Sequence, residues 1–450
     1  MPSSSTLTST STPRDLGGGL ILRRATRADA DAVAHFNAIV QRDPGVSEPV
    51  EAEAAWAYDL FRENHPTFRL EDFTIVEDTA AGKIVSVSNL IPQTWTYGSI
   101  PFGVGRPELV GTLPEYRHRG LVRAQFDVLH AWSAAAGHKL QAITGIPFFY
   151  RQFGYEMAMD LEGGRQGPVQ NVTPLKAGAQ EAFTCRPVDE TDLPFILRTG
   201  QEASRRLLVA CVRDEALWRY EVFGKSEHNI TRLEWRIVQT AGGETVGYLG
   251  HEARLQGKRL LLRVCELQAG VSWLAAAPGI LRYLKSAGES YAQRDAAAFD
   301  AIYAAFGPVH PMYEAVQNQL PQVRRSYAWY LRVPDLPDFL RHIAAVLEER
   351  LARSAAAGHA GELKLSFYRS GVRLQLKAGR LAAVEPWRPS HEEPGVAGFP
   401  GLTFLQLLFG YRTLEELRYA FADCWVDGDE ATGLLNALFP KQPSFVWPVS

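Results

Sequence analysis

The clearest indication of the fold lies at residues 110–123, which read Val110-Gly111-Thr112-Leu113-Pro114-Glu115-Tyr116-Arg117-His118-Arg119-Gly120-Leu121-Val122-Arg123. An apolar strand here runs into a basic turn, and the turn opens a helix predicted over 121–136. The amides of the turn and of the first helical residues point toward one place, and the arginines add positive charge. The stretch therefore predicts an anion site, although an ordinary strand–turn–helix corner with a solvated basic turn would contain the same residues.

A second motif follows about 30 residues further on and reads Phe149-Tyr150-Arg151-Gln152-Phe153-Gly154-Tyr155. Arg117-x-x-Gly120 resembles the pyrophosphate-binding R/Q-x-x-G-x-G/A motif of the GNAT acyltransferases, and the second motif resembles that superfamily's F-Y-x-x-x-G-F/Y signature. Val122 departs from the first motif, because most of the superfamily has Gly or Ala at that position. The departure indicates a subgroup of the superfamily.

The remainder of the chain alternates strands and helices, and this pattern begins again near residue 183. Two tandem acetyltransferase-like units followed by an α+β unit resemble the Eis (enhanced intracellular survival) family of acetyltransferases, in which a bulky residue such as Val122 is normal. The implied fold class is α/β and α+β: two GNAT folds, each a mixed central sheet flanked by helices, and then a sterol-carrier-like domain. The predicted parts are a disordered leader at 1–19, a catalytic GNAT domain at 20–165, a degenerate GNAT domain at 183–333 that Tyr327–Val333 closes, and a sterol-carrier-like domain at 334–450.

The resemblance implies acetyl-CoA as the co-substrate and assigns residues to its parts. The strand residues Val110, Gly111 and Thr112 would lie along the acyl carbonyl and pantetheine, with Gly145 and Ile146 flanking the pantetheine arm. The pyrophosphate would lie on the basic loop, which consists of Arg117, His118, Arg119, Gly120, Leu121, Val122 and Arg123.

Tyr150 matches the general acid of the family. A phenol with a pKa near 10 stays neutral at pH 7 and can protonate the departing CoA thiolate. The alternative is that Tyr150 is a core aromatic residue beside Phe148 and Phe149.

In the same family the C-terminal carboxylate of the chain reaches the first unit's active site and acts as the general base, which assigns this role to Ser450. The preceding segment Phe445–Val449 is apolar and aromatic, as a buried segment should be, but this chain ends on Ser where an aromatic residue is expected. A tail packed on the third unit and a base acting through water are the alternatives.

The second unit lacks the anion loop. Its corresponding stretch reads Cys265-Glu266-Leu267-Gln268-Ala269-Gly270-Val271-Ser272-Trp273, without an Arg-x-x-Gly sequence. This copy is therefore predicted to be non-catalytic and to shape the substrate cleft or an oligomer contact.

Composition excludes several classes of protein. The 450 residues include 47 Lys and Arg against 50 Asp and Glu, so the net charge of −3 argues against a nucleic-acid-binding protein. The 4 cysteines lie far apart and the 11 histidines form no H-x-x-x-H pair, so neither a disulfide framework nor a metal site is predicted.

No apolar run reaches the roughly 18 residues needed to cross a bilayer, and no signal peptide is recognisable. We expect a cytoplasmic protein without a membrane partner.

These observations predict an acetyl-CoA-dependent N-acetyltransferase in which a primary amine attacks the thioester directly in a ternary complex. The resemblance implies an aminoglycoside-like polyamine or a lysine side chain as substrate, and a homo-oligomer, such as a hexamer, as the assembly. The acidic stretch 43–78 would attract a cationic amine to the acceptor side of the site. The alternative is that this stretch is an ordinary solvated acidic surface. The alternative function is a non-catalytic CoA- or lipid-binding protein that uses the third unit.

Overall fold

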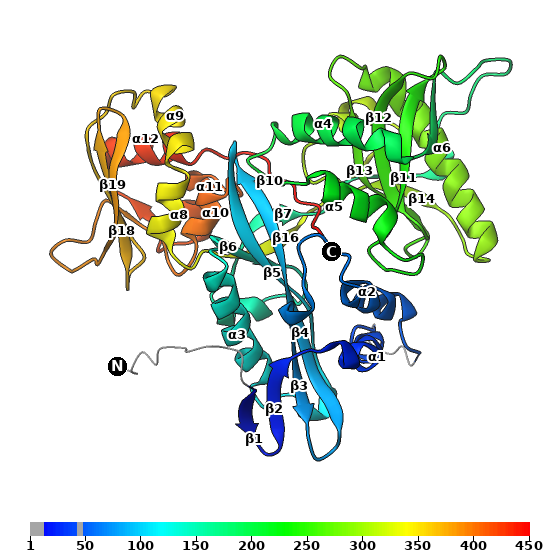
Figure 1. Ribbon diagram of the computed structural model, residues 1–450. Helices are drawn as coiled ribbons and strands as arrows, with labels where there is room; N and C mark the ends of the chain where they lie inside the picture. Colours follow the sequence, from blue (N-terminus) through cyan, green and yellow to red (C-terminus); the bar gives the residue numbers. More distant parts are fainter. Residues whose placement is uncertain (1–12, 43–47) are drawn as a thin grey trace.

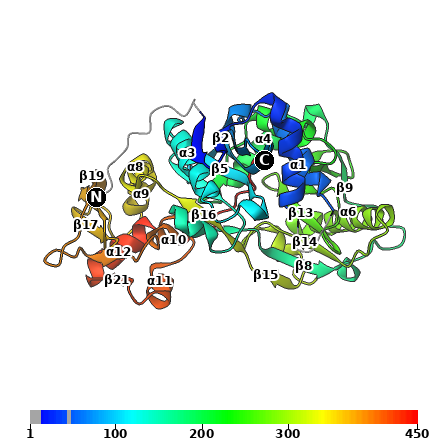
Figure 2. The ribbon, with the colours of Figure 1, turned by 90° about the horizontal axis from the view of Figure 1, so that it is seen from below.

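The computed structural model describes residues 13–42 and 48–450, and within these residues the strands form three sheets (Figure 1). We call residues 13–163 the first unit, 164–333 the second unit and 334–450 the third unit. Figures 1 and 2 both show the first unit between the other two, with the third unit on one side and the second on the other. The mixed α/β class predicted from the sequence is confirmed.

The first sheet has the strand order β1-β2-β3-β4-β5-β6-β16-β7, with β10 paired to β4. Every pair is antiparallel except β5 with β6. Helices α1 and α2 cover one face and α3 covers the other. The bounds are β1 Arg14–Gly17, β2 Leu20–Arg24, β3 Phe73–Asp78, β4 Lys83–Tyr97, β5 Ile100–Thr112, β6 Leu140–Ile143, β7 Glu156–Leu161, β10 Val209–Cys211, β16 Tyr327–Arg332, α1 Ala30–Val40, α2 Glu51–Phe61 and α3 Leu121–Ala135.

The second sheet repeats this arrangement. Its order β9-β11-β12-β13-β14-β8-β15 corresponds, position by position, to β2-β3-β4-β5-β6-β16-β7 of the first sheet. The bounds are β8 Gly164–Pro168, β9 Phe183–Pro187, β11 Leu233–Thr240, β12 Thr245–Glu252, β13 Arg259–Leu267, β14 Ala301–Ala304, β15 Gln322–Arg324, α4 Leu193–Ser204, α5 Glu215–Arg219, α6 Trp273–Arg294 and α7 Met312–Ala315.

The two sheets exchange one strand each. Strand β16, predicted to close the second unit, lies instead between β6 and β7 of the first sheet, and β8 lies between β14 and β15 of the second. The crossing segments pass so closely that a Cβ on Gly163 would lie 2.7 Å from the amide nitrogen of Ser326. The prediction for β16 was wrong because its apolar pattern requires a central strand position but does not say in which sheet.

The third unit is α+β, as predicted, with the strand order β19-β18-β17-β20-β21. Its first helical stretch, residues 336–352, is interrupted at Ile343, where α8 ends and α9 begins. The bounds are α8 Leu336–His342, α9 Ala344–Ala352, β17 Gly361–Ser366, β18 Gly371–Lys377, β19 Arg380–Trp387, β20 Ala397–Gly398, α10 Phe404–Leu408, α11 Leu414–Ala420, β21 Trp425–Val426 and α12 Gly428–Leu438.

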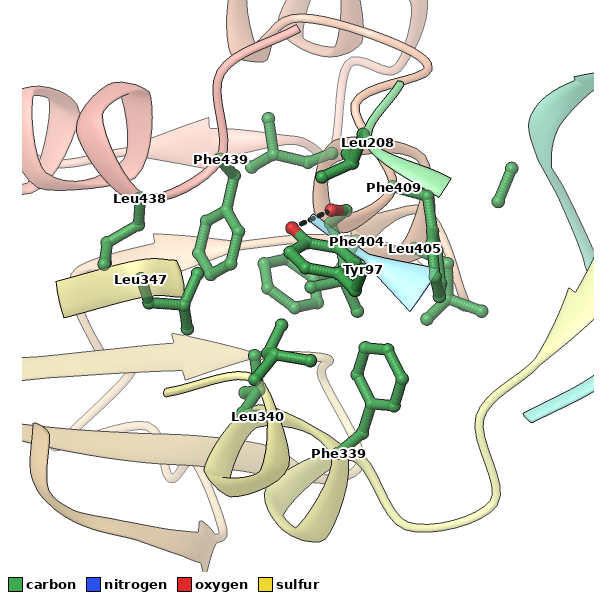
Figure 3. Close-up of a cluster of buried hydrophobic side chains, with 14 of the residues drawn as sticks. Tyr97, Leu208, Phe339, Leu340, Leu347, Phe404, Leu405, Phe409, Leu438 and Phe439 are labelled. Atoms are coloured by element: carbon green, nitrogen blue, oxygen red, sulfur yellow. Dashed lines mark hydrogen bonds between the residues drawn. The ribbon is translucent and has the colours of Figure 1, made fainter. Parts of the chain in front are cut away.

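One apolar core joins the first and third units. Tyr97, at the end of β4, is buried among aromatic and aliphatic side chains of the third unit, and its hydroxyl donates to the carbonyl of Leu408 at 2.7 Å (Figure 3). Phe339 packs against it edge to face, with ring centroids 6.0 Å apart. The apolar face of the third sheet is therefore packed against its own helices and against the first unit.

The leader prediction is wrong for part of its range. Residues 14–17 form strand β1, which pairs with β2 across a turn of three glycines with positive φ. A run of glycines is typical of disordered segments, but here the three glycines adopt the positive φ values that a tight hairpin turn requires. The rest of the predicted leader, residues 1–12, lies outside the described residues.

Candidate active site

A cavity of about 740 Å³ opens in the first unit where β5 ends. Its walls come from the end of α1, the last residues of β5, the basic loop, the start of α3 and the 3-10 helix Phe149–Phe153. The lining residues are Val40, Gln41, Arg42, Val110, Gly111, Thr112, Tyr116, Arg117, His118, Gly120, Leu121, Val122, Arg123, Ile146, Phe149, Gln152 and Phe153. Of the residues predicted to contact acetyl-CoA, all except Arg119 and Gly145 thus line this one cavity.

The cavity exists because β5 and β6 separate. The two parallel strands pair only at Val104 with Leu140 and at Gly105 with Gln141, and beyond these pairs β5 continues without β6. A register shift against β4 and a positive φ of 49° at Leu109 bend β5 just before the cavity. A Cβ on Gly111 would lie 2.7 Å from Val40, so glycine allows α1 to approach the strand.

The basic loop leads directly into α3. Gly120, with φ of 77°, is the N-cap residue of this 15-residue helix and offers no capping side chain, so the first amides of α3 have no side-chain acceptor at the cap. Arg123 donates to Gln152 at 3.0 Å, which ties α3 to the 3-10 helix. Arg119 is not among the lining residues, and it donates to the carbonyl of Glu115 and lies over the ring of Tyr116, which does line the cavity.

Tyr150 is buried, with 3 % of its surface exposed, and belongs to the same 3-10 helix as Phe149, Gln152 and Phe153, which line the cavity. Its ring contacts Phe126 and also Tyr330 of β16, at centroid distances of 5.9 and 5.5 Å. Its hydroxyl lies 3.9 Å from the position of a Cβ on Gly145 and makes no hydrogen bond with residues 13–42 or 48–450. Burial, the Glu108 carboxylate and Tyr330 raise the pKa of this phenol, so it stays protonated.

The sequence analysis did not single out two charged residues of β5, Arg106 and Glu108, of which Glu108 is near enough to raise the pKa of Tyr150. Glu108 and Arg106 form an ion pair with side chains 14 % and 6 % exposed, and burial raises the pKa of Glu108. Glu53 of α2 is close enough to Glu108 that burial and this carboxylate together raise its pKa to about 7. Two charges alternating within an otherwise apolar strand were the signal in the sequence that could have identified this pair.

The segment predicted to approach the active site is buried near these charges. Ser450 is 5 % exposed, and the carbonyl of Val449 accepts hydrogen bonds from Gln93 and from Arg106, both at 2.9 Å. Figure 1 shows the segment leaving the third unit and ending between the first and second units. Arg106 thus contacts both the tail and Glu108.

The corresponding tyrosine of the second unit is placed differently. The hydroxyl of Tyr313 accepts from the amide of Phe306 and donates to the carbonyl of Gly307, both at 3.0 Å. The connection from β13 to α6, residues 268–272, contains no arginine or lysine where the first unit has its basic loop, and Glu266 near the end of β13 pairs with Arg206. The second unit therefore holds its tyrosine as a structural residue.

Part of the acidic stretch 43–78 holds the fold together. Asp59, fully buried, accepts from Ser226 and Asn229 of the second unit, and Glu77 pairs with Arg23. Asp43 lies outside the described residues. The structure thus leaves Glu53 as the acidic residue of this stretch that is coupled to the site.

Other chemistries find little support. The described residues contain no group of three or more potential metal ligands, and no helix among them is long and apolar enough to cross a membrane. Cys211 lies beside the first unit, because β10 pairs with β4. Burial raises the pKa of its thiol, which disfavours a nucleophilic thiolate.

Comparison with known proteins agrees with this geometry. The family model of the acetyltransferase (GNAT) domain matches residues 22–158, and no curated protein matches the sequence significantly. A probable N-acyltransferase of Enterococcus faecalis is 13% identical with a TM-score of 0.64, and the match covers 96% of this chain and 100% of that one. A GCN5-related N-acetyltransferase of Kribbella flavida is 16% identical with a TM-score of 0.63, covering 96% and 98%. Eis1 of Mycobacterium abscessus is 14% identical with a TM-score of 0.57, covering 94% and 98%. The chain therefore contains a GNAT acetyltransferase domain at residues 22–158 and shares its overall fold with proteins named as N-acetyltransferases.

Proposed function

We propose that the protein is an N-acetyltransferase that transfers the acetyl group of acetyl-CoA to a primary amine. The observation that carries this proposal is the cavity that joins the basic loop and the start of α3 to the 3-10 helix that carries Tyr150. A long thioester with an anionic end fits such a cavity, because the helix N-terminus attracts the anion. Acetyl-CoA would lie with its pyrophosphate on residues 117–123 and its pantetheine between Val110–Thr112 and Gly145–Ile146.

In the proposed reaction the amine nitrogen attacks the thioester carbon in a ternary complex, and the carbon–sulfur bond breaks. Tyr150 donates its proton to the departing thiolate, and its raised pKa keeps that proton available. The amine proton passes to the Glu108 carboxylate or, as the family resemblance implies, to a carboxylate at Ser450. Positioning of the reactants supplies a large share of the rate enhancement.

The acceptor is proposed to be a cationic amine, such as an aminoglycoside-like polyamine or a lysine side chain. Glu108 acts on Tyr150 through its charge and Glu53 is coupled to Glu108, and these carboxylates would attract a protonated amine and then accept its proton. The alternative of a lipid-binding protein receives less support, because apolar residues of the third sheet such as Leu363, Leu365 and Leu374 are fully buried in the core shared with the first unit. The resemblance of the third unit to a sterol carrier stays a prediction.

The proposal is tested by measuring thiol release from acetyl-CoA with a panel of amines and CoA binding by calorimetry. We expect turnover with at least one polyamine or lysine peptide, and one CoA per chain, because the second unit has no basic loop. Two CoA sites per chain, or binding without turnover of any amine, would contradict it.

A double charge reversal, Arg117→Glu with Arg123→Glu, locates the CoA site. It should weaken CoA binding at least about a hundredfold, since a hydrogen bond to a charged group is worth roughly 1.5–3 kcal/mol. The matched control is Arg198→Glu with Arg205→Glu, which reverses two exposed charges at helix α4 of the second unit and should leave binding unchanged. Equal weakening in both variants would place the CoA elsewhere.

A further inference from the structure

The tail, residues 443–450, runs alongside strand β10 before it reaches the active site. The amide of Leu208 donates to the carbonyl of Pro443 at 2.8 Å, and the amide of Phe445 donates to the carbonyl of Val209 at 3.1 Å. These backbone contacts fix the course of the tail but do not depend on its side chains.

Trp447 is the side chain that anchors the tail to the second unit. Its ring packs edge to face against Trp235 of β11, with centroids 5.3 Å apart. The guanidinium of Arg213 lies over the Trp447 ring, 4.2 Å from its centroid. The ammonium of Lys225 lies 5.7 Å from the same centroid. Arg213 also donates a hydrogen bond to the backbone carbonyl of Trp447, so one side chain holds both the ring and the main chain.

A second anchor follows two residues later and belongs to the first unit. There the Val449 carbonyl accepts from Gln93 and Arg106, and Arg106 is the partner of Glu108. Glu108 in turn acts on Tyr150 through its charge. The tail thus connects a contact in the second unit to the charged pair beside the proposed general acid.

We infer that the second unit, which lacks its own anion loop, serves as the receptor for the tail, and that Arg213 is a positioning residue for acetyl transfer. Arg213 fixes Trp447, the fixed tail presents the Val449 carbonyl to Arg106, and Arg106 holds Glu108 beside Tyr150. This inference rests on the proposed function for its catalytic consequence. Its structural part, the anchoring of the tail, stands independently.

The test compares Arg213→Met with Arg236→Met in the full chain. Arg236 follows Trp235 on β11 and so points to the opposite face of the strand, where it lies over Tyr283 and pairs with Glu234. The first readout is the release of Ser450 and Val449 by a carboxypeptidase, followed by intact mass. The wild type should resist digestion because both residues are buried, whereas Arg213→Met should release them at least about tenfold faster, because the segment opens more often. Arg236→Met should behave as wild type.

The second readout is kinetic and uses whichever amine the panel identifies. Arg213→Met should lower kcat about tenfold or more and leave the affinity for CoA unchanged, approaching the value of a variant that lacks Val449 and Ser450. Arg213→Lys, which keeps a cation and one donor, should restore part of both the protease resistance and kcat. A purely structural role of Arg213 would instead lower the melting temperature without this rescue.

Unchanged digestion in Arg213→Met would overturn the inference. If that variant does not fold, Trp447→Leu, which removes the ring but leaves Arg213, must give the same faster digestion, and failure to do so would overturn it equally. Absence of acetyl transfer by the wild type would contradict the proposed function, while the digestion result would still decide whether the second unit holds the tail.

Discussion

Tyr150 is the residue on which the proposed chemistry can be tested most directly. Tyr150→Phe removes the proton donor but keeps the ring that packs against Phe126 and Tyr330. We expect CoA affinity to stay unchanged and kcat to fall by about 10²–10⁴, the usual effect of removing a positioned general acid. Steady-state kinetics and calorimetry measure the two quantities.

The second unit supplies a matched control for that variant. Tyr313→Phe removes a buried hydroxyl that is hydrogen bonded to the backbone at Phe306 and Gly307, so it should lower the free energy of unfolding by about 1–3 kcal/mol and leave kcat unaltered. A full-activity Tyr150→Phe enzyme would exclude Tyr150 from the reaction. A loss of kcat in Tyr313→Phe would contradict the assignment of Tyr313 as a purely structural residue.

Among single residues, the sequence predicted those that belong to motifs and missed the charged residues that interact with one another near Tyr150. Arg117–Arg123 and Tyr150 have fixed spacing along the chain, so their proximity could be inferred. Arg106 and Glu108 share one face of β5, which their alternation in the strand could have shown, whereas Glu53 approaches Glu108 only through the docking of α2, which no local pattern specifies. A turn sequence does not show which of its arginines faces the cavity, so the role of Arg119 stays a prediction.

Among the elements, β16 offers a test of the strand exchange. A fragment containing residues 13–165 has every motif of the acetyltransferase domain but lacks β16, so β6 and β7 would each lose a strand partner and Tyr150 would lose Tyr330. We expect this fragment to be insoluble or to unfold without cooperativity, because unpaired apolar strand edges aggregate. The soluble yield measures the solubility of the fragment, and thermal unfolding followed by circular dichroism measures its cooperativity.

The comparison fragment carries β16 as well, joined to residue 165 by a flexible linker that spans the second unit. It should recover solubility and a cooperative transition. A stable, cooperatively folded 13–165 fragment would mean that β16 is dispensable to the first sheet. The sequence predicted most of these strands, because alternation and turn residues are local, but it could not predict which sheet a strand joins, because that depends on contacts between distant segments.

For the whole molecule, buried histidines predict how stability depends on pH. His65, 1 % exposed, accepts from the amides of Thr67 and Phe68, and burial lowers its pKa to about 3 from an ordinary value of 6.5. The unfolded chain therefore binds more protons between these values, so the contribution of His65 is complete above pH 6.5 and is lost as the pH falls toward 3. At pH 5 the loss is about 2 kcal/mol.

Urea unfolding at pH 7.5 and pH 5 measures this loss. His65→Asn keeps a side-chain acceptor for the two amides without titrating, and should show a smaller change in unfolding free energy between the two pH values. An identical pH dependence in both proteins would mean that His65 becomes protonated without unfolding the chain.

Assembly is the remaining prediction at this scale. The family resemblance implies a homo-oligomer, and light scattering should then give a mass that is a multiple of the 49.9 kDa chain. A mass of one chain at working concentration would contradict it. No pattern within one sequence specifies a subunit contact, so this prediction depends on the resemblance alone.

The exchange of β8 and β16 also has a consequence for the order in which the protein is made. The ribosome completes β7 at Leu161, yet the strand that lies between β6 and β7 ends only at Arg332. At 5–20 residues per second, the nascent first sheet waits on the order of 10–30 s for its missing strand. The outcome expected for the 13–165 fragment then extends to synthesis: the first sheet is completed only after β16 has emerged, and until then the edges of β6 and β7 that pair with β16 stay exposed.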